Sequence, residues 1–195
     1  HYGVITSIDI DENCSKAISG SWDKTAILWD LDYLEQPFVI NFEKQVTAVA
    51  ISPDGSYCIC GDRSGFIKML NTSSKNETNI FQEQSMDSIS YIIAKNDKFL
   101  LVFRNGSVSV WDAKNVKSIY THRPNGRFIT AIDVYGDKVA SSSRNGSTII
   151  WELSTGKVIK ELLHEGEVVK KCKIVNSDAV ITITGDGILK IWEIS

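Results

Sequence analysis

Short runs in which apolar and polar residues alternate recur along the whole chain. Val46–Ile51 is one such run, and a second strand-like run, Tyr57–Cys60, follows the turn-forming residues Ser52–Gly55. Alternation with a period of two indicates a strand with one face toward a core, and Ser-Pro-Asp-Gly is typical of a tight turn. No stretch sustains the periodicity of an amphipathic helix. The pattern therefore predicts antiparallel strands joined by short turns.

The strand pattern repeats with a nearly constant period. A bulky anchor residue stands in the third strand-like run of each copy, and successive anchors are 41, 41, 40 and 41 residues apart: Trp29, Leu70, Trp111, Trp151 and Trp192. Five residues before four of these anchors stands a glycine that follows Asn, Asp or Ser. An Asn-Gly or Asp-Gly pair between apolar runs favours a two-residue hairpin turn, because both central residues need positive φ. The second and third strands of each copy are therefore predicted to form a hairpin.

Each copy also has a looser fourth run, such as Val158–Leu163, and so predicts four antiparallel strands. One small sheet cannot cover both of its faces, whereas sheets packed side by side around an axis can. We therefore predict an all-β fold, a β-propeller of four-stranded antiparallel blades that spans residues 1–195. The predicted repeats cover about residues 1–41, 42–81, 82–121, 122–163 and 164–195, and the last one lacks its outer strand.

The repeats resemble WD repeats, which are about 40–45 residues long and end in Trp-Asp. The chain carries Trp29-Asp30 and Trp111-Asp112, and the weaker pairs Trp151-Glu152 and Trp192-Glu193. The resemblance covers the whole chain. Since most WD-repeat propellers have seven blades, it implies that these five repeats are an excerpt from a larger propeller.

Composition limits the compartment and the partners. The chain has 43% hydrophobic and 23% charged residues, as is ordinary for a globular protein, and its net charge is −3. A weakly acidic chain has no overall attraction to nucleic acid or to an anionic membrane, and no apolar run reaches the ~20 residues of a membrane-spanning helix. The four cysteines form no C-x-x-C pair, which favours a reduced setting in the cytoplasm or nucleus. We expect no cofactor and no metal site.

Two histidines stand at matching distances before their anchors, each with a hydroxyl and a carboxylate. His1, Ser19, Asp23 and Trp29 have the same spacing as His164, Thr182, Asp186 and Trp192. Hydroxyl, imidazole and carboxylate also make up a hydrolase triad, but no nucleophile elbow or oxyanion hole accompanies them. The resemblance implies instead a structural hydrogen-bond tetrad, in which the four groups satisfy one another away from water. The second and third repeats lack the set and are expected to depend more on apolar packing.

Candidates for partner binding come from positions that the predicted fold does not require. Directly before the turn residue of the hairpin, the first repeat carries tryptophan and the next three carry arginine: Trp22, Arg63, Arg104 and Arg144. Arg123 and Arg127 lie in the loop that enters the fourth repeat. In WD-repeat propellers these turns lie on the top face, where this position often contacts partners. The resemblance thus implies a basic surface that could bind carboxylates or phosphate by bidentate hydrogen bonds, with Trp22 as an aromatic anchor. The alternative is that each arginine lies solvated over its own turn.

The favoured interpretation is a non-catalytic scaffold or ligand-sensing module within a larger complex. It would bind a protein or peptide, acidic and phosphorylated ones included. A regulatory sensor domain of a nucleotide-driven switch protein stays open as an alternative. A phosphoinositide-binding propeller is less favoured, because Phe103–Gly106 has one Arg where the F-R-R-G motif has two. An enzyme is also less favoured, because the first-strand runs offer few inward carboxylates, namely Asp9 and Asp133.

Overall fold

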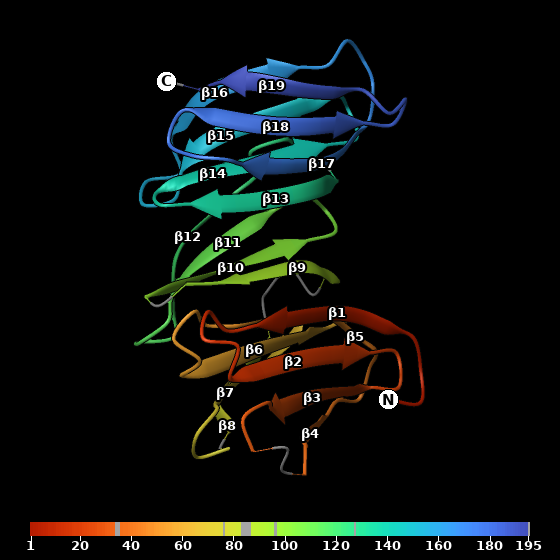
Figure 1. Cartoon of the computed structure of the whole chain (residues 1–195), viewed down its shortest axis with the longest axis vertical. Helices are drawn as coiled ribbons and strands as arrows, with labels where there is room; N and C mark the ends of the chain where they lie inside the picture. Colours follow the sequence, from red (N-terminus) through yellow and green to blue (C-terminus); the bar gives the residue numbers. More distant parts are fainter. Residues whose placement is uncertain (34–35, 76, 83–86, 96, 127, 195) are drawn as a thin grey trace. The chain divides into compact units, whose positions relative to one another are not determined.

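The computed structural model describes residues 1–33, 36–75, 77–82, 87–95, 97–126 and 128–194, with the backbone alone for 77–82. Within these ranges the chain forms strands β1 to β19 and no helix (Figure 1). Neighbouring strands are antiparallel, and most are joined by tight turns. The prediction of an all-β chain built from antiparallel hairpins is confirmed.

Five sheets follow one another, and each consists of strands that are consecutive in the chain. The first sheet consists of β1 (Ile5–Ile10), β2 (Lys16–Ser21), β3 (Thr25–Asp30) and β4 (Phe38–Asn41). The second consists of β5 (Val46–Ile51), β6 (Tyr57–Asp62), β7 (Phe66–Asn71) and β8 (Glu77–Gln82). The third consists of β9 (Ile89–Ala94), β10 (Lys98–Phe103), β11 (Val108–Asp112) and β12 (Lys117–His122). The last two are β13 (Ile129–Tyr135), β14 (Lys138–Ser143), β15 (Ser147–Glu152) and β16 (Val158–Leu163); and the three-stranded sheet of β17 (Val169–Ile174), β18 (Ala179–Thr184) and β19 (Leu189–Glu193).

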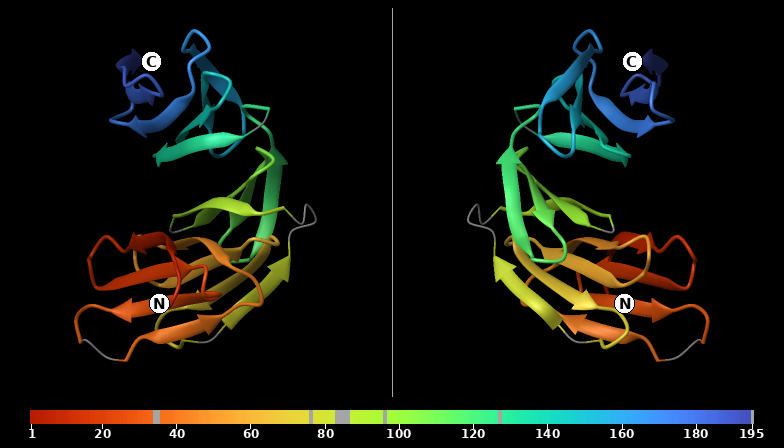
Figure 2. Two further views of the ribbon diagram at one scale, coloured as in Figure 1. Left: turned by 90° about the vertical axis from the view of Figure 1, so that its right-hand side faces the viewer. Right: turned by 90° about the vertical axis from the view of Figure 1, so that its left-hand side faces the viewer.

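The chain forms two compact units. The first comprises His1–Phe103 and Ser109–Ile119, and the second comprises Arg104–Val108 and Tyr120–Ser195. Within the first unit β1 lies beside β5 and β5 beside β9, and within the second β13 lies beside β17 (Figure 2). Consecutive sheets of a unit therefore place their first strands side by side, as the blades of a propeller do.

Apolar side chains fill the spaces between consecutive sheets. Ile18 and Leu28 from the first sheet share a buried cluster with Val49, Cys60 and Leu70 from the second. A second cluster joins the second and third sheets, and a third joins the fourth and fifth. Because burial of one large aliphatic side chain contributes about 1.5–3 kcal/mol, these inter-sheet clusters are the main source of stability.

A β-bulge interrupts the pairing of the first and second strands at the same place in every sheet. In three sheets the extra residue is a threonine, namely Thr6, Thr47 or Thr130. The hydroxyl of Thr6 donates to the carbonyl of Val46 at 2.8 Å, and that of Thr130 to the carbonyl of Val169 at 2.5 Å. At Thr6 and Thr130 the bulge thus turns a hydroxyl toward the next sheet and links the two first strands, whereas the hydroxyl of Thr47 donates to the carbonyl of Gly61 in its own sheet.

Two glycines allow neighbouring sheets of the first compact unit to approach closely. A Cβ atom at Gly20 would lie 2.7 Å from Cγ1 of Val46, and one at Gly61 would lie 2.5 Å from Cδ1 of Ile89. Both glycines belong to second strands, against which the following sheet packs. A side chain at either position would force the facing valine or isoleucine to shift.

Candidate functional site

The first sheet places its histidine, serine, aspartate and tryptophan in one hydrogen-bonded chain. Nε2 of His1 lies 2.8 Å from Oγ of Ser19, which accepts the indole N–H of Trp29 at 2.9 Å. Nδ1 of His1 lies 3.0 Å from Oδ2 of Asp23 and also 3.0 Å from Oγ1 of Thr25. The four residues come from the segment before β1, from β2, from the β2–β3 turn and from β3. The arrangement ties these parts of the sheet together.

Asp23 is held as a carboxylate by its neighbours. Burial alone would raise the pKa of this group, but hydrogen bonds from the Thr25 hydroxyl and from the backbone N–H groups of Tyr2 and Thr25 outweigh it and hold the pKa below its usual value. Both oxygens accept, since Oδ1 receives the Thr25 hydroxyl at 2.6 Å and Oδ2 the Tyr2 N–H at 2.8 Å. The carboxylate therefore links the β2–β3 turn to the segment before β1.

This chain of groups does not present a nucleophile. Ser19 is only 3% exposed, and its oxygen accepts the N–H of Trp29. A catalytic serine needs an exposed oxygen next to its base and donors for an oxyanion. The geometry instead satisfies buried polar groups, which would each cost about 1–3 kcal/mol if left without a partner.

The fifth sheet differs from the predicted tetrad at Asp186. Nε2 of His164 lies 2.9 Å from Oγ1 of Thr182, which accepts the N–H of Trp192 at 2.7 Å. Nδ1 of His164, however, lies 3.0 Å from the carbonyl of Gly146 in the β14–β15 turn, and Asp186 accepts the hydroxyl of Thr184 at 2.5 Å. Asp186 thus keeps only local hydrogen bonds, and the carbonyl of Gly146 takes the place of the aspartate beside Nδ1 of His164. Burial lowers the pKa of His164, and the hydrogen bond to Gly146 offsets this only in part.

The fourth sheet keeps part of the motif. Trp151 donates its indole N–H to Ser141 at 3.0 Å, and the ring of His122 packs edge-on against Trp151 with centroids 4.4 Å apart. Asn125 is buried and donates to the carbonyl of Ser141 at 2.8 Å. Nε2 of His122 and Oδ1 of Asn125 are buried without a partner in the described part of the chain.

The second sheet replaces the motif with apolar groups, and the third keeps only the tryptophan, whose indole N–H donates to Ser109 at 2.9 Å. In the second sheet Phe42 and Cys60 have the spacing of His1 and Ser19, and Leu70 stands at the anchor. Phe42, Cys60 and Leu70 all belong to the buried cluster between the first two sheets. In the third sheet Trp111 stacks on Phe99 with ring centroids 5.8 Å apart.

Asp9 and Asp133, the carboxylates considered for a reaction centre, accept backbone N–H groups from the neighbouring sheet. Oδ2 of Asp9 accepts from Ile51 at 2.9 Å, and Oδ2 of Asp133 accepts from Ile174 at 2.8 Å. Burial raises the pKa of Asp9 despite the hydrogen bond from Ile51. The two groups stand at corresponding places and link first strands, as the bulge threonines do.

The arginine candidates lie next to well-fixed turns. The turn after Arg63 is held by Asp62, whose Oδ1 accepts the N–H of Ser64 at 2.8 Å, and Arg63 itself donates to Gln45 Oε1 at 3.2 Å. Asn105 and Asn145 play the same part in the turns of Arg104 and Arg144, each accepting the N–H two residues ahead. A glycine with φ between 79° and 85° completes each turn. The backbone of each turn is therefore fixed independently of any contact that the arginine side chain makes.

All of the described candidates are exposed. Arg63, Arg104, Arg123 and Arg144 are exposed, and Trp22 is 52% exposed. Arg127 lies outside the described residues. Trp22 and Arg63 belong to the first compact unit, and the other described arginines belong to the second. The single basic surface expected from the sequence therefore stays a prediction.

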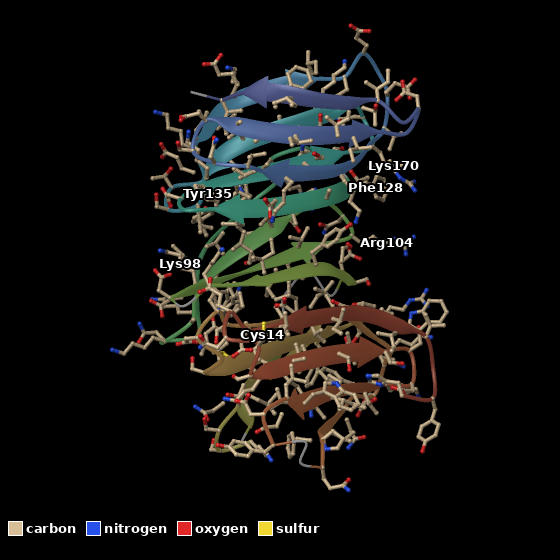
Figure 3. The ribbon with its side chains drawn as sticks, in the orientation of Figure 1. Cys14, Lys98, Arg104, Phe128, Tyr135 and Lys170 are labelled. Atoms are coloured by element: carbon tan, nitrogen blue, oxygen red, sulfur yellow. The ribbon has the colours of Figure 1, made fainter. Side chains whose placement is uncertain are left out.

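In the second compact unit Figure 3 labels Arg104, Phe128 and Lys170 at one end and Tyr135 at the other. The loop that enters β13 and the β14–β15 and β18–β19 turns share the end where Arg104 lies (Figure 1). Partner-binding candidates of this unit thus come from loops and turns at one end of its sheets.

In the described ranges no group of three or more His, Cys, Asp or Glu side chains could hold a metal ion, and no helix is long and apolar enough to cross a bilayer. All four cysteines are free thiols, with Cys14 exposed and Cys58, Cys60 and Cys172 buried. Burial raises the pKa of Cys172 to about 11, so this thiol is a poor nucleophile.

Comparison with known proteins agrees with the repeat pattern. A family model described as WD domain, G-beta repeat matches residues 1–30 and 37–71. A WD repeat-containing protein 26 homolog from Arabidopsis thaliana is 28% identical over 187 residues, which cover 90% of the chain and 31% of that relative.

Two further relatives carry different names. Autophagy-related protein 16 from Arabidopsis thaliana is 22% identical over 180 residues, which cover 88% of the chain and 35% of the relative. A guanine nucleotide-binding protein subunit beta-like protein from Encephalitozoon cuniculi is 27% identical over 176 residues, which cover 76% of the chain and 49% of the relative. The chain thus spans between 31% and 49% of the length of these three relatives.

Proposed function

The chain belongs to the WD-repeat family, and on that premise we propose that it is a non-catalytic scaffold that binds a protein or peptide through its hairpin turns. The observation that carries the proposal is the recurrence of an exposed arginine directly before a fixed turn in three successive sheets. Because the backbone of these turns is already fixed, only the arginine side chain has to be ordered when it pairs with a carboxylate or phosphate. Trp22 at the corresponding place of the first sheet adds an aromatic contact.

We place the five sheets in a larger propeller of about seven blades. The adjacent first strands within each compact unit support this arrangement. So does exposed apolar surface on β1 and β19, where Ile8 is 72% and Ile191 is 70% exposed, because a further blade would cover such side chains. The propeller would then present Arg63, Arg104 and Arg144 on one face, with Arg123 and Arg127 in the loop beside them.

We expect an acidic or phosphorylated partner within a complex of several subunits. The basic turn residues favour anionic groups, although the chain as a whole is weakly acidic. One relative is named for its likeness to a subunit of a guanine nucleotide-binding protein, which is in keeping with a place in a complex. The four free thiols support a reduced compartment, so we expect the protein in the cytoplasm or nucleus.

The test is a triple variant with Arg63→Glu, Arg104→Glu and Arg144→Glu. It should capture partners from cell lysate at least about tenfold less well than the unmodified protein, because reversal of exposed contact charges slows association and loses bidentate hydrogen bonds. Its melting temperature should stay unchanged, since the turns are held by Asp62, Asn105 and Asn145.

A matched control separates specific contacts from overall charge. Lys114→Glu, Lys117→Glu and Lys157→Glu change the net charge by the same amount at exposed positions after the third strands. Undiminished capture by the arginine variant, or an equal loss in the lysine control, would mean that the arginines are solvated surface residues that bind no partner.

A further inference from the structure

Two corresponding aspartates of the first strands differ in whether the chain supplies them with a cation. Asp9 of β1 and Asp133 of β13 each accept a backbone N–H from the first strand of the next sheet, at 2.9 and 2.8 Å. Nζ of Lys173 also lies 2.8 Å from Oδ1 of Asp133, so this carboxylate has both an N–H and an ammonium group as partners. Asp9 has the N–H, but the residues that the structure describes supply it with no cation.

Alanine stands where the missing lysine would be. Lys173 comes directly before the residue whose N–H Asp133 accepts. Between the first two sheets that place belongs to Ala50, whose methyl group offers no charge to Asp9. Burial raises the pKa of Asp9, because the backbone N–H groups around it offset only part of the cost of removing a carboxylate from water. The carboxylate of Asp9 is therefore short of a positive partner.

A pocket opens beside Asp9. It has a volume of about 290 Å³, and its described walls come from β1, β5 and β9 and from the turns after β1 and β5, all in the first compact unit. Asp9 and Glu12 are the charged groups of this described lining, which includes no lysine, arginine or histidine. The volume is close to the lower end of the range of about 300–1,000 Å³ for ligand pockets, which suits a single side chain. The charge of the pocket selects a cation.

The rest of the wall suits an aliphatic chain. Most of the other described lining residues are aliphatic, and Ile10, Ile51 and Ile93 represent the three first strands among them. Ile10 and Ile93 keep part of their surface exposed. A lysine can pack its methylene groups along such surface while its ammonium group reaches a carboxylate.

The pocket lies away from the turn that carries Trp22. Ile5 pairs with Ser21 directly before that turn, whereas Ile10 pairs with Ala17 at the opposite end of the two strands. Asp9 and Glu12 stand at the end of Ile10. The pocket thus offers a site of opposite charge to the arginine turns, at a different end of the sheet.

We propose that the pocket at Asp9 and Glu12 binds a lysine side chain of a partner protein. The ammonium group would pair with Asp9 as that of Lys173 pairs with Asp133, and the methylene groups would lie along the isoleucines. Glu12 is exposed and would add a second carboxylate at the rim. This site goes beyond the proposed binding of acidic groups by the turn arginines, because its occupant is basic.

The probe is Nα-acetyl-lysine N-methylamide, which carries a lysine side chain without charged termini. Saturation-transfer difference NMR with the unmodified protein should show the strongest transfer to the δ and ε methylene protons, and a titration yields the dissociation constant. The corresponding norleucine compound has an aliphatic side chain but no ammonium group. It should bind at least about tenfold more weakly, because it cannot form the charge-assisted hydrogen bond.

Variants of the two acids locate the site. Asp9→Asn keeps an oxygen for the N–H of Ile51 and removes the charge, so it should weaken binding at least about tenfold with the melting temperature little changed. Asp133→Asn is the matched control, since this residue has the same role in the other compact unit, and it should leave binding unchanged. Glu12→Lys, at an exposed position, places a competing ammonium group at the rim and should abolish the saturation transfer even if Asp9→Asn proves unstable.

The proposal would be overturned by the absence of saturation transfer, by equal binding of the norleucine compound, or by equal effects of Asp9→Asn and Asp133→Asn. Tighter binding of n-butylammonium would assign the pocket to a free amine, and tighter binding of the blocked arginine compound would assign it to arginine. Either result would also reject a lysine side chain as the occupant. None of these outcomes depends on the triple arginine variant, so failure of this site and failure of the scaffold function are told apart.

Discussion

The first and second sheets have the same strand order and the same bulge, yet they fill the space beside the hairpin turn with different chemistry. The register is shared, since Trp29 pairs with Ala17 in the first sheet and Leu70 with Cys58 in the second. The first sheet uses a buried hydrogen-bonded chain from His1 to Trp29, whereas the second buries Phe42 and Leu70 in an apolar cluster.

The difference shows that the backbone of a repeat does not require the polar motif. Both sheets have a turn fixed by an aspartate, a bulge, and close packing on the next sheet. In the first sheet the buried polar groups satisfy one another through hydrogen bonds. In the second sheet apolar side chains pack together beside a pocket. Loss of the tetrad therefore exchanges an internal hydrogen-bond network for apolar packing.

Among the variants that test this comparison, the largest loss of stability is expected in the apolar cluster of the second sheet. Leu70→Ala removes a fully buried side chain from the cluster between the first two sheets, and should destabilise the chain by about 2–5 kcal/mol. Denaturant unfolding followed by tryptophan fluorescence measures the loss. Ile119→Ala, at a position that is 46% exposed, is the control and should cost about 0.5 kcal/mol or less. A loss at Leu70 no greater than in the control would mean that the second sheet does not depend on its apolar anchor.

A smaller loss of stability is expected in the hydrogen-bonded chain of the first sheet. Ser19→Ala takes away the oxygen that accepts from Trp29 and lies 2.8 Å from Nε2 of His1, so it leaves two buried ring nitrogens without their partner. The expected loss is about 1–3 kcal/mol in the same unfolding assay. Ser118→Ala, on the exposed face of β12, should change stability little. If Ser19→Ala matched this control, the hydrogen-bonded chain would contribute no net stability.

Much of the architecture could be predicted from the sequence, because its signals are local. The spacing of the tryptophans and the Asn-Gly and Asp-Gly pairs predict the hairpins, and the registers pair Trp29, Trp151 and Trp192 with the second strands of their sheets as expected. Alternation predicts the strands for the same reason, since it depends only on residues close in the chain.

What could not be predicted depends on contacts between sheets or on competition between partners. Asp9 and Asp133 look like channel carboxylates in the sequence, but each accepts an N–H some 40 residues away. Asp186 has the spacing of Asp23, yet Nδ1 of His164 lies beside the carbonyl of Gly146 from the neighbouring sheet instead. The recurring threonine near the start of the first strand was a signal for the inter-sheet hydrogen bonds, but its role follows only from the bulge.

The smallest expected effect is on the pH dependence of the free energy of unfolding, in which Asp23 and Asp186 should differ. Asp23 has a pKa below its ordinary value of 3.8, so the unfolded chain binds more protons in acid than the folded one. Its contribution to stability is complete above this ordinary pKa and is lost as the pH falls through the lower pKa of the folded state. Asp23→Asn should therefore flatten the fall in the free energy of unfolding between about pH 5 and pH 2.

Asp186→Asn is the matched control for this prediction. Its pKa is also lowered, chiefly by the Thr184 hydroxyl, but the carboxylate is exposed and its hydrogen bonds stay within one turn. Solvent screens such a group, so its replacement should alter the acid limb less than that of Asp23. Urea unfolding in a series of buffers measures both curves. Equal changes would mean that the bond from Asp23 to His1 adds nothing beyond the turn, and that the polar network ends at the serine and the tryptophan.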